Sequence, residues 1–333
     1  MTQPNVLVLL DTPEAELRSA AKELLTLARG IGNPVAVALA EPSETTVEQL
    51  KEYGVAQLLV AHIQGETSVH LSPVAAEALA LAVEKIQARA VLASPTFENK
   101  EIAARLAYAI GAGLVIDTVT VGLEGSDFIG YKRVFAGAWD IDCKITTPVA
   151  VATVRANAVV PTPAETPAQT IVREDYDVQP SELAQSVVLV SRTEHPPIAG
   201  GTGRPKLAEA AYVVAGGRGT GGDFGPVEEL ADVLGGAVGA TRDAVDEGWI
   251  EHDAQIGQTG VTVAPRVYIG AGISGAPHHR GGMQASGVII AVNSDADAPI
   301  FEISDFGVVG ELADVLPQAA QAIREYKASQ YDI

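Results

Sequence analysis

Short apolar runs alternate with longer amphipathic segments through the first third of the chain. The short runs are typical of buried parallel strands, and the longer segments have apolar positions at helical spacing. Asp11 and Thr12 before Pro13 are typical of a helix start. The strand–helix–strand rhythm predicts parallel pairing with right-handed crossovers. We expect strands at 5–10, 34–40, 57–61 and 90–94, and helices at about 13–29, 45–53, 72–89 and 99–110.

The rhythm changes between residues 114 and 194. Strand-like runs lie at 119–121, 128–135, 149–154 and 186–191. The segment 161–167 holds three prolines and cannot be helix interior. We expect these runs to add strands to the edge of the first sheet, joined by an extended loop.

Prolines and glycines without periodicity mark a linker that begins at His195. After it the α/β pattern returns, with expected strands at 211–215, 237–238, 266–269 and 287–292. Expected helices lie at 225–234, at 242–247, from Ser274 onward and at about 311–326. The pattern therefore predicts an α/β protein of two domains, each an open, mostly parallel sheet flanked by helices. We place the first domain at 1–194, the linker at 195–208 and a Rossmann-like second domain at 209–333.

Composition and charge exclude several classes of protein. The 333 residues are 47% apolar and 19% charged, enough for two full cores. The net charge of -20 disfavours nucleic acid and anionic membrane surfaces as partners. The single cysteine, Cys143, excludes a disulfide framework within the chain and agrees with a reducing compartment. With neither a leader nor a long apolar run, we expect a soluble, cytoplasmic protein without membrane insertion.

Five glycine-rich or polar turns lie between Tyr212 and Asn293, each next to an apolar run. In an open α/β sheet such turns gather at the carboxyl edge of the strands, where ligands bind. We interpret them together as one binding surface for a large phosphate-bearing cofactor. The turns are 217–222, 239–242, 257–260, 273–279 and 291–293.

Each turn also has a simpler explanation. Residues 217–222 fit G-x-G-x-x-G after a strand, but the acidic residue expected about 20 positions later for a nicotinamide cofactor is not clearly placed. Arg242 suits a phosphate or an aromatic ring, and equally a surface ion pair. The turn 257–260 could be an ordinary polar turn, and Asn293 could end a β-turn. His278 and His279 are adjacent and lack partners at metal-ligand spacing, so no metal site is predicted.

Six segments of the second domain closely resemble the electron transfer flavoprotein alpha subunit family. The first domain fits more loosely, through its α/β order and residues 105–117. The segments are Gly-Gly-Arg-Gly at 216–219, the run 230–246, Gln-Ile-Gly-Gln-Thr-Gly at 255–260, Ala-Pro-Arg-Val-Tyr-Ile at 264–269, Gly-Ile-Ser-Gly-Ala at 272–276, and Ile-Ala-Val-Asn with Ala-Pro-Ile-Phe at 290–301.

The resemblance implies a heterodimer with a beta subunit. It implies that FAD is held mainly by the second domain, and that AMP lies in the beta subunit. It also implies electron transfer from acyl-CoA and related dehydrogenases to a membrane quinone oxidoreductase. The chain would then be an electron carrier in fatty acid beta-oxidation, with no catalytic residues of its own. The alternatives are a nicotinamide-dependent Rossmann oxidoreductase and a non-redox nucleotide-binding module.

The resemblance also implies roles for single residues. Arg242 would lie over the flavin ring, and Thr259 near flavin N5. His279 would face the O2 side of the ring as a hydrogen-bond donor, where it would favour the reduced, anionic flavin. Pro277, His278 and Glu311 depart from the residues common at these positions in the family. The full set of expected FAD-binding residues is Arg218, Thr241, Arg242, Gln255, Gly257, Gln258, Thr259, Gly272, Ser274, Gly275, Ala276, His278, His279, Asn293, Asp305, Glu311 and Leu312.

Overall fold

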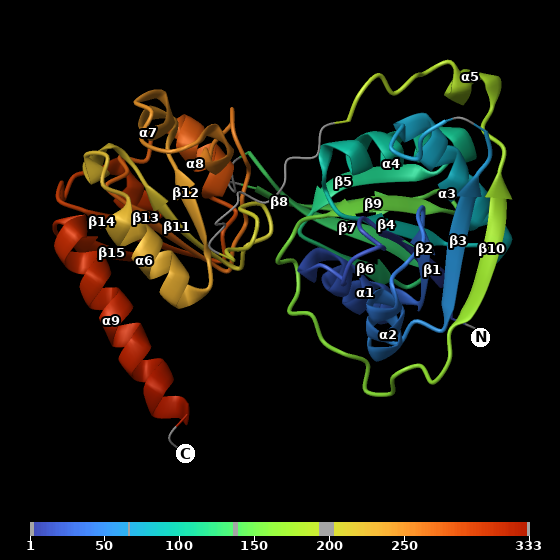
Figure 1. Cartoon of the computed structure of the whole chain (residues 1–333), viewed down its shortest axis with the longest axis horizontal. Coiled ribbons are helices and arrows are strands. Elements are labelled where there is room, and N and C mark those ends of the chain that lie inside the picture. Colours follow the sequence, from blue (N-terminus) through green and yellow to red (C-terminus); the bar gives the residue numbers. More distant parts are fainter. Residues whose placement is uncertain (1–2, 66, 136–138, 193–202, 332–333) are drawn as a thin grey trace. The chain divides into compact units, whose positions relative to one another are not determined.

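The computed structural model is an α/β protein with two parallel sheets and one small antiparallel sheet (Figure 1). It describes residues 3–65, 67–135, 139–192 and 203–331. The chain divides into two compact units, Met1–Lys132 with Asp140–Glu194, and Arg133–Trp139 with His195–Ile333. The fold class predicted from the sequence is confirmed, while the limits of the linker stay a prediction because residues 193–202 lie outside the described residues.

The first unit is built on a seven-stranded parallel sheet with the order β10-β3-β2-β1-β4-β9-β5. Helices α1 and α2 cover one face and α3 and α4 the other, because each pair contributes its apolar residues to a different core cluster. The elements are β1 (Asn5–Leu10), α1 (Ser19–Ile31), β2 (Asn33–Ala38), α2 (Glu44–Glu52), β3 (Gln57–Ile63), α3 (Ser72–Ile86), β4 (Ala90–Ala93), α4 (Phe97–Ile110), β5 (Gly113–Thr118), β9 (Ala150–Val154), β10 (Val172–Val178) and α5 (Glu182–Gln185).

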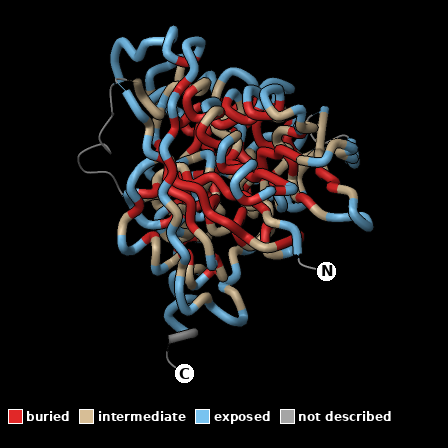
Figure 2. The backbone as a smooth tube through the Cα atoms, turned by 90° about the vertical axis from the view of Figure 1, so that its right-hand side faces the viewer, coloured by how far each residue is buried: buried red, intermediate tan, exposed pale blue. Residues whose placement is uncertain are grey.

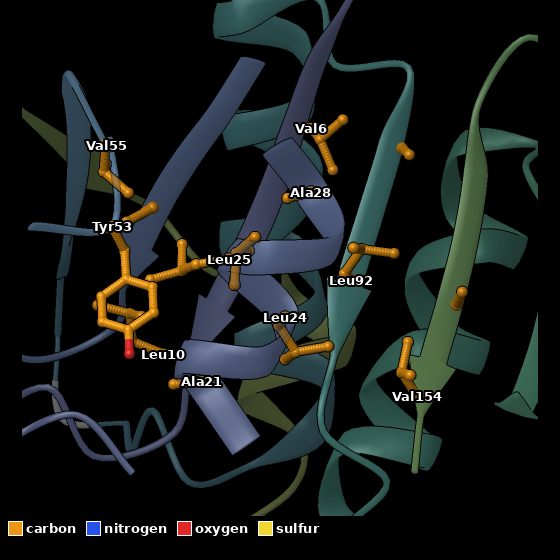
Figure 3. Packing of buried hydrophobic residues seen from close by; sticks show 14 of the residues in the cluster. Val6, Leu10, Ala21, Leu24, Leu25, Ala28, Tyr53, Val55, Leu92 and Val154 are labelled. Atoms are coloured by element: carbon orange, nitrogen blue, oxygen red, sulfur yellow. The ribbon is translucent and has the colours of Figure 1, made fainter. Parts of the chain in front are cut away.

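Both faces of the central strands are buried, which explains their continuous apolar sequence. Most residues of these strands are buried, and Figure 2 shows buried stretches of backbone surrounded by exposed ones. In Figure 3, Leu24 and Leu25 of α1 lie against the strand residues Leu10 and Leu92. The amphipathic spacing of α1 thus directs one apolar stripe onto the sheet.

Truncation of Leu25 tests this packing. The side chain is fully buried in the cluster between α1 and the sheet. We expect Leu25→Ala to lower the free energy of unfolding by about 2–5 kcal/mol, because it removes buried methyl groups and leaves a cavity. Urea unfolding measures this loss. A cost below ~1 kcal/mol would contradict the packing shown.

Two sequence predictions for the first unit are wrong. The first helix starts at Ser19 and not at Pro13, because the Asp11 carboxylate accepts hydrogen bonds from Ser94 Oγ (2.6 Å) and Asn99 Nδ2 (2.7 Å) instead of capping a helix. Residues 186–191 form no strand and are exposed.

The added strands are also placed differently from the prediction. Strand β9 lies between β4 and β5 inside the sheet, and the edge opposite β5 is β10, which the sequence pattern did not reveal. The runs near 120 and 130 belong to a separate antiparallel sheet, β6-β7-β8. Its strands are β6 (Thr120–Glu124), β7 (Asp127–Val134) and β8 (Trp139–Ile145).

The second unit contains a five-stranded parallel sheet with the order β12-β11-β13-β14-β15. Helices α6 and α9 pack on one face, while α8 and the 3₁₀ turn η3 pack on the other. The elements are β11 (Tyr212–Gly216), η1 (Arg218–Thr220), α6 (Gly225–Leu234), β12 (Ala237–Ala240), α7 (Arg242–Asp246), η2 (His252–Ala254), β13 (Val267–Ala271), α8 (Pro277–Met283), β14 (Val288–Asn293), η3 (Pro299–Ile303), β15 (Phe306–Val309) and α9 (Leu312–Tyr331).

Candidate functional site

The turns that follow β11, β12, β13 and β14 meet at the carboxyl edge of the five-stranded sheet. Backbone hydrogen bonds join them in sequence around this edge. Gly219 N donates to Gly272 O (3.0 Å), Thr241 N to Gly216 O (3.0 Å), and Gly272 N to Val292 O (2.8 Å). The parallel register therefore brings together segments that are up to about 75 residues apart in sequence.

The glycine-rich turn after β11 owes its glycines to packing against the neighbouring turn. A Cβ at Gly217 would lie 2.4 Å from Gly272 O, and a Cβ at Gly219 would lie 2.6 Å from Gly272 Cα. Gly272 itself has φ +62°. These glycines are thus required for two backbone turns to touch, as well as for any ligand to approach.

The start of α6 does not resemble a free pyrophosphate site. The helix begins at Gly225, after a 3₁₀ turn, and Gly225 N donates to the Asp223 carboxylate at 2.9 Å. An acidic side chain already occupies the position where a dinucleotide phosphate would bind. This geometry weakens the nicotinamide interpretation of G-x-G-x-x-G.

Two exposed arginines supply positive charge at the edge. Arg218 Nε lies 3.2 Å from Asp243 Oδ2, and Arg242 Nε lies 3.1 Å from Asp246 Oδ2. Their side chains are 71% and 67% exposed, so these pairs are worth little and can be exchanged for a ligand anion. Thr241 is buried and caps α7, because its hydroxyl accepts from Ala244 N at 3.5 Å.

The segment Gln255–Thr259 is buried at its first three residues and exposed at its last two. Gln255 is buried and its Nε2 donates to Thr259 Oγ1 at 2.9 Å. Gln258 and Thr259 are exposed. Gly257 is buried against α8, where a Cβ would lie 3.1 Å from His278 O. The segment therefore presents an amide and a hydroxyl group outward from a fixed base.

The turn after β13 does not start a helix at Ser274, as the sequence suggested. Helix α8 begins at Pro277, and the preceding Gly275 has φ +84° and sits against Ile300, where a Cβ would lie 2.6 Å from Ile300 N. Ser274 and Ala276 are exposed beside it. His278 is exposed too, with Nδ1 3.0 Å from Gln258 Oε1.

His279 is buried, with both ring nitrogens engaged inside the unit. Its Nε2 lies 2.7 Å from the Tyr268 hydroxyl, and its Nδ1 lies 3.1 Å from Ile256 O. A carbonyl oxygen only accepts, so Nδ1 donates and Nε2 accepts from the tyrosine. In this arrangement both ring nitrogens already have partners inside the unit, and the direct contact with a flavin expected from the sequence stays a prediction.

The burial of His279 has a consequence for stability. Burial lowers its pKa from 6.5 to about 4, and the hydrogen bond to Ile256 opposes the shift only partly. The unfolded chain therefore binds more protons between these values, and stability falls as the pH drops through this window. We expect this group to remove about 3 kcal/mol of unfolding free energy between pH ~7 and ~4.

Urea unfolding across this pH range measures the loss, with His278→Gln as the control because His278 is exposed. His279→Gln should flatten the curve, whereas His278→Gln should leave it unchanged. A curve that keeps its full slope in His279→Gln would contradict the buried, neutral state.

The remaining expected residues divide between the two edges of the sheet. Asn293 lies at the carboxyl edge, where its Nδ2 donates to Ile273 O at 2.9 Å. Glu311 directly precedes α9 and Leu312 begins it at the same edge. The side chain of Leu312 lies in the core, which leaves only its backbone for a ligand. Asp305 precedes β15 at the opposite, amino edge and accepts from Ile289 N at 2.8 Å. The structure thus separates Asp305 from the other residues.

The donor set of the carboxyl edge suits a phosphate-bearing ligand with a polar heterocycle. Two guanidinium groups attract anionic oxygens, and an amide, hydroxyls and an imidazole can match a ring edge. Within the described ranges no group of three or more His, Cys, Asp or Glu side chains could hold a metal ion. No helix in the described part of the chain combines the length and hydropathy that a transmembrane span requires.

Tyr268 is the residue at this site that sequence reasoning missed. It lies fully buried in β13 between apolar neighbours. A tyrosine inside a buried strand needs a hydrogen-bond partner, which was a usable signal. The partner, His279, is 11 positions away on α8 and only the fold reveals it.

Comparisons with known proteins point to one family for the whole chain. The sequence family called electron transfer flavoprotein domain matches residues 6–180. The family called electron transfer flavoprotein FAD-binding domain matches residues 206–284. The alpha subunit of electron transfer flavoprotein from Mycobacterium leprae is 43% identical over 325 residues, covering 96% of this chain and 98% of the relative. That from Bacillus subtilis is 31% identical over 325 residues, covering 96% and 97%.

Proposed function

The chain belongs to the electron transfer flavoprotein alpha subunit family, and from this premise we propose that the carboxyl edge of its five-stranded sheet holds FAD for electron transfer between partner proteins. It is an electron carrier with an FAD-binding domain, and not an enzyme with its own substrate. Its place as an alpha subunit implies a complex with a beta subunit. One observation supports the proposed site above all: turns from four parallel strands meet there, and the first three of these turns lie within the residues matched by the FAD-binding domain, 206–284.

The proposed contacts follow from what each side chain exposes. Arg218 and Arg242 attract the anionic parts of the cofactor, and their acidic partners are exposed and replaceable. Gln258, Thr259 and His278 offer hydrogen bonds to a polar ring edge. The other proposed contacts are Thr241, Gln255, Gly257, Gly272, Ser274, Gly275, Ala276, Asn293, Glu311 and Leu312, several of them through the backbone.

His279 and Asp305 are not among the side chains that we propose to contact the cofactor directly. His279 acts from behind the surface, since both of its nitrogens are engaged with Tyr268 and Ile256. Asp305 lies at the amino edge and is left out. Bound FAD supplies the redox chemistry, and the residues of this chain bind it, orient it and set the charge around it.

The finer assignments rest on the family resemblance. We propose that the beta subunit carries AMP, that acyl-CoA and related dehydrogenases donate the electrons of fatty acid beta-oxidation, and that a membrane quinone oxidoreductase accepts them. The cytoplasmic location stays a prediction. The charge of -20 would favour docking on basic surfaces of these partners.

Anaerobic reduction by a dehydrogenase tests the donor assignment. The heterodimer is mixed with a catalytic amount of an acyl-CoA dehydrogenase and its acyl-CoA substrate, and the visible flavin absorption is followed. We expect the absorption to bleach only when dehydrogenase and substrate are both present. Bleaching by NADH alone would favour the nicotinamide-dependent oxidoreductase, and a complex without any flavin would favour the non-redox module.

A further inference from the structure

A buried tyrosine–histidine pair lies directly behind the proposed FAD surface. Tyr268 of β13 is fully buried, and His279 of α8 is 7% exposed. The hydroxyl oxygen of Tyr268 lies 2.7 Å from His279 Nε2, and the two ring centroids are 6.1 Å apart. The pair connects strand β13 of the five-stranded sheet to helix α8, which packs on one face of that sheet.

The hydrogen bonds of His279 fix which nitrogen carries the proton. Ile256 O can only accept, so Nδ1 of His279 holds the proton and donates it at 3.1 Å. Nε2 is then an acceptor, and the Tyr268 hydroxyl is its donor. The carbonyl of Ile256 thus selects the Nδ1–H tautomer, and the Tyr268 hydroxyl anchors the ring at Nε2 in the orientation that this hydrogen bond requires.

Ile256 is held through both of its backbone polar groups, and it belongs to the segment that carries Gln258 and Thr259. It lies between Gln255 and Gly257, and its own N–H donates to Ala240 O at 2.8 Å. The next residue, Gly257, lies directly against α8, since a Cβ on Gly282 of that helix would be only 2.4 Å from Gly257 N. The helix and the segment therefore pack in direct backbone contact. A rotation of the His279 ring would therefore remove one of the hydrogen bonds that hold the base of this segment.

We infer that Tyr268 is a positioning residue for the FAD surface: by anchoring Nε2 of His279, it holds the imidazole in the orientation in which Nδ1 donates to Ile256 O, and so supports the segment that carries the exposed Gln258 and Thr259. This inference rests on the proposed function, because it assigns Tyr268 a role toward the cofactor that the segment binds. A purely structural role would consist of filling the core with the ring and satisfying its hydroxyl.

The substitution Tyr268→Phe in the heterodimer tests the inference. It keeps the aromatic ring and removes only the hydroxyl. Tyr176→Phe is the matched control, because Tyr176 is also buried and donates to Ala78 O at 3.0 Å, but in the first unit. Two quantities are measured: the tautomer of His279, from ¹⁵N chemical shifts of the ring, and the rate at which FAD dissociates.

In the wild type we expect the Nδ1–H tautomer alone. In Tyr268→Phe we expect a mixture of tautomers and about tenfold faster release of FAD, the effect of one lost buried hydrogen bond. Tyr176→Phe should change neither quantity. Unchanged FAD release in Tyr268→Phe would overturn the inference, whatever the tautomer.

A double-mutant cycle separates positioning from core filling. In a His279→Gln background, Tyr268→Phe should add little to the rate of FAD release, because its effect passes through His279. An effect of undiminished size in that background would overturn the inference. A wild-type heterodimer in which the alpha subunit binds no FAD would instead contradict the proposed function, while the tautomer measurement could still be made.

Discussion

Gly272→Ala should weaken FAD binding by about tenfold or more, beyond any effect of its backbone angle. A Cβ at this position would lie 2.7 Å from Gly219 Cα, 2.9 Å from Leu312 Cδ2 and 3.0 Å from the carbonyl carbon of Gly219. Two of these neighbours are backbone atoms that no side-chain rotation can move. The methyl group must therefore push apart the turns after β11 and β13, which form the centre of the proposed site.

Gly221→Ala is the matched control for this prediction. Gly221 has φ +59°, close to the φ +62° of Gly272, but a Cβ there would meet nothing within 4 Å. Both variants bear the same strain of a left-handed backbone, about 1–2 kcal/mol. Titration of the flavin-free heterodimer with FAD measures both. Equal affinities in the two variants would contradict the role of the packed turns.

The second large effect is expected on the flavin potential. Arg242→Ala should lower it by about 50 mV, because a unit charge about 4 Å from the reduced ring contributes about 1 kcal/mol in a water-like medium. The side chain is 67% exposed, and its ion pair with Asp246 leaves it able to turn toward a ligand. Removal of the arginine favours the oxidised, neutral ring.

Two variants control for this effect. Arg242→Lys keeps the charge and should retain most of the potential, although it loses the planar guanidinium. Arg324→Ala removes an equally charged, 53% exposed side chain of α9 that pairs with Glu229 of α6, and should leave the potential unchanged. A redox titration of each complex gives the potentials. An unchanged potential in Arg242→Ala would show that this arginine is not near the ring.

The fold could be predicted where local pattern decides it. Strands β1 to β4 and helices α2 to α4 follow from apolar runs and amphipathic spacing alone. The order of the strands could not be predicted, because the position of β9 between β4 and β5 depends on contacts distant in sequence. β10 was missed since its sequence, Val-Arg-Glu-Asp-Tyr-Asp-Val, is rich in charge, as an edge strand can be.

The site could be predicted as a set of turns, because parallel strands place their carboxyl ends together. The position of Asp305 at the amino edge could not be predicted, since the short strand β15 that follows it was not recognised in the sequence. Without that strand, nothing marked Asp305 as lying at the amino edge. The burial of His279 was not predictable from its neighbours, because its partner Tyr268 is on a different element.

Hydrogen–deuterium exchange of the heterodimer, with FAD bound and after flavin removal, tests the central claim most directly. It reports which backbone amides of this chain become protected when the cofactor binds. We predict protection concentrated in the turns after β11, β12, β13 and β14, together with residues 255–260, and none at the amino edge near Asp305. Protection confined to other surfaces, or no difference at these turns, would contradict the placement of FAD on this edge.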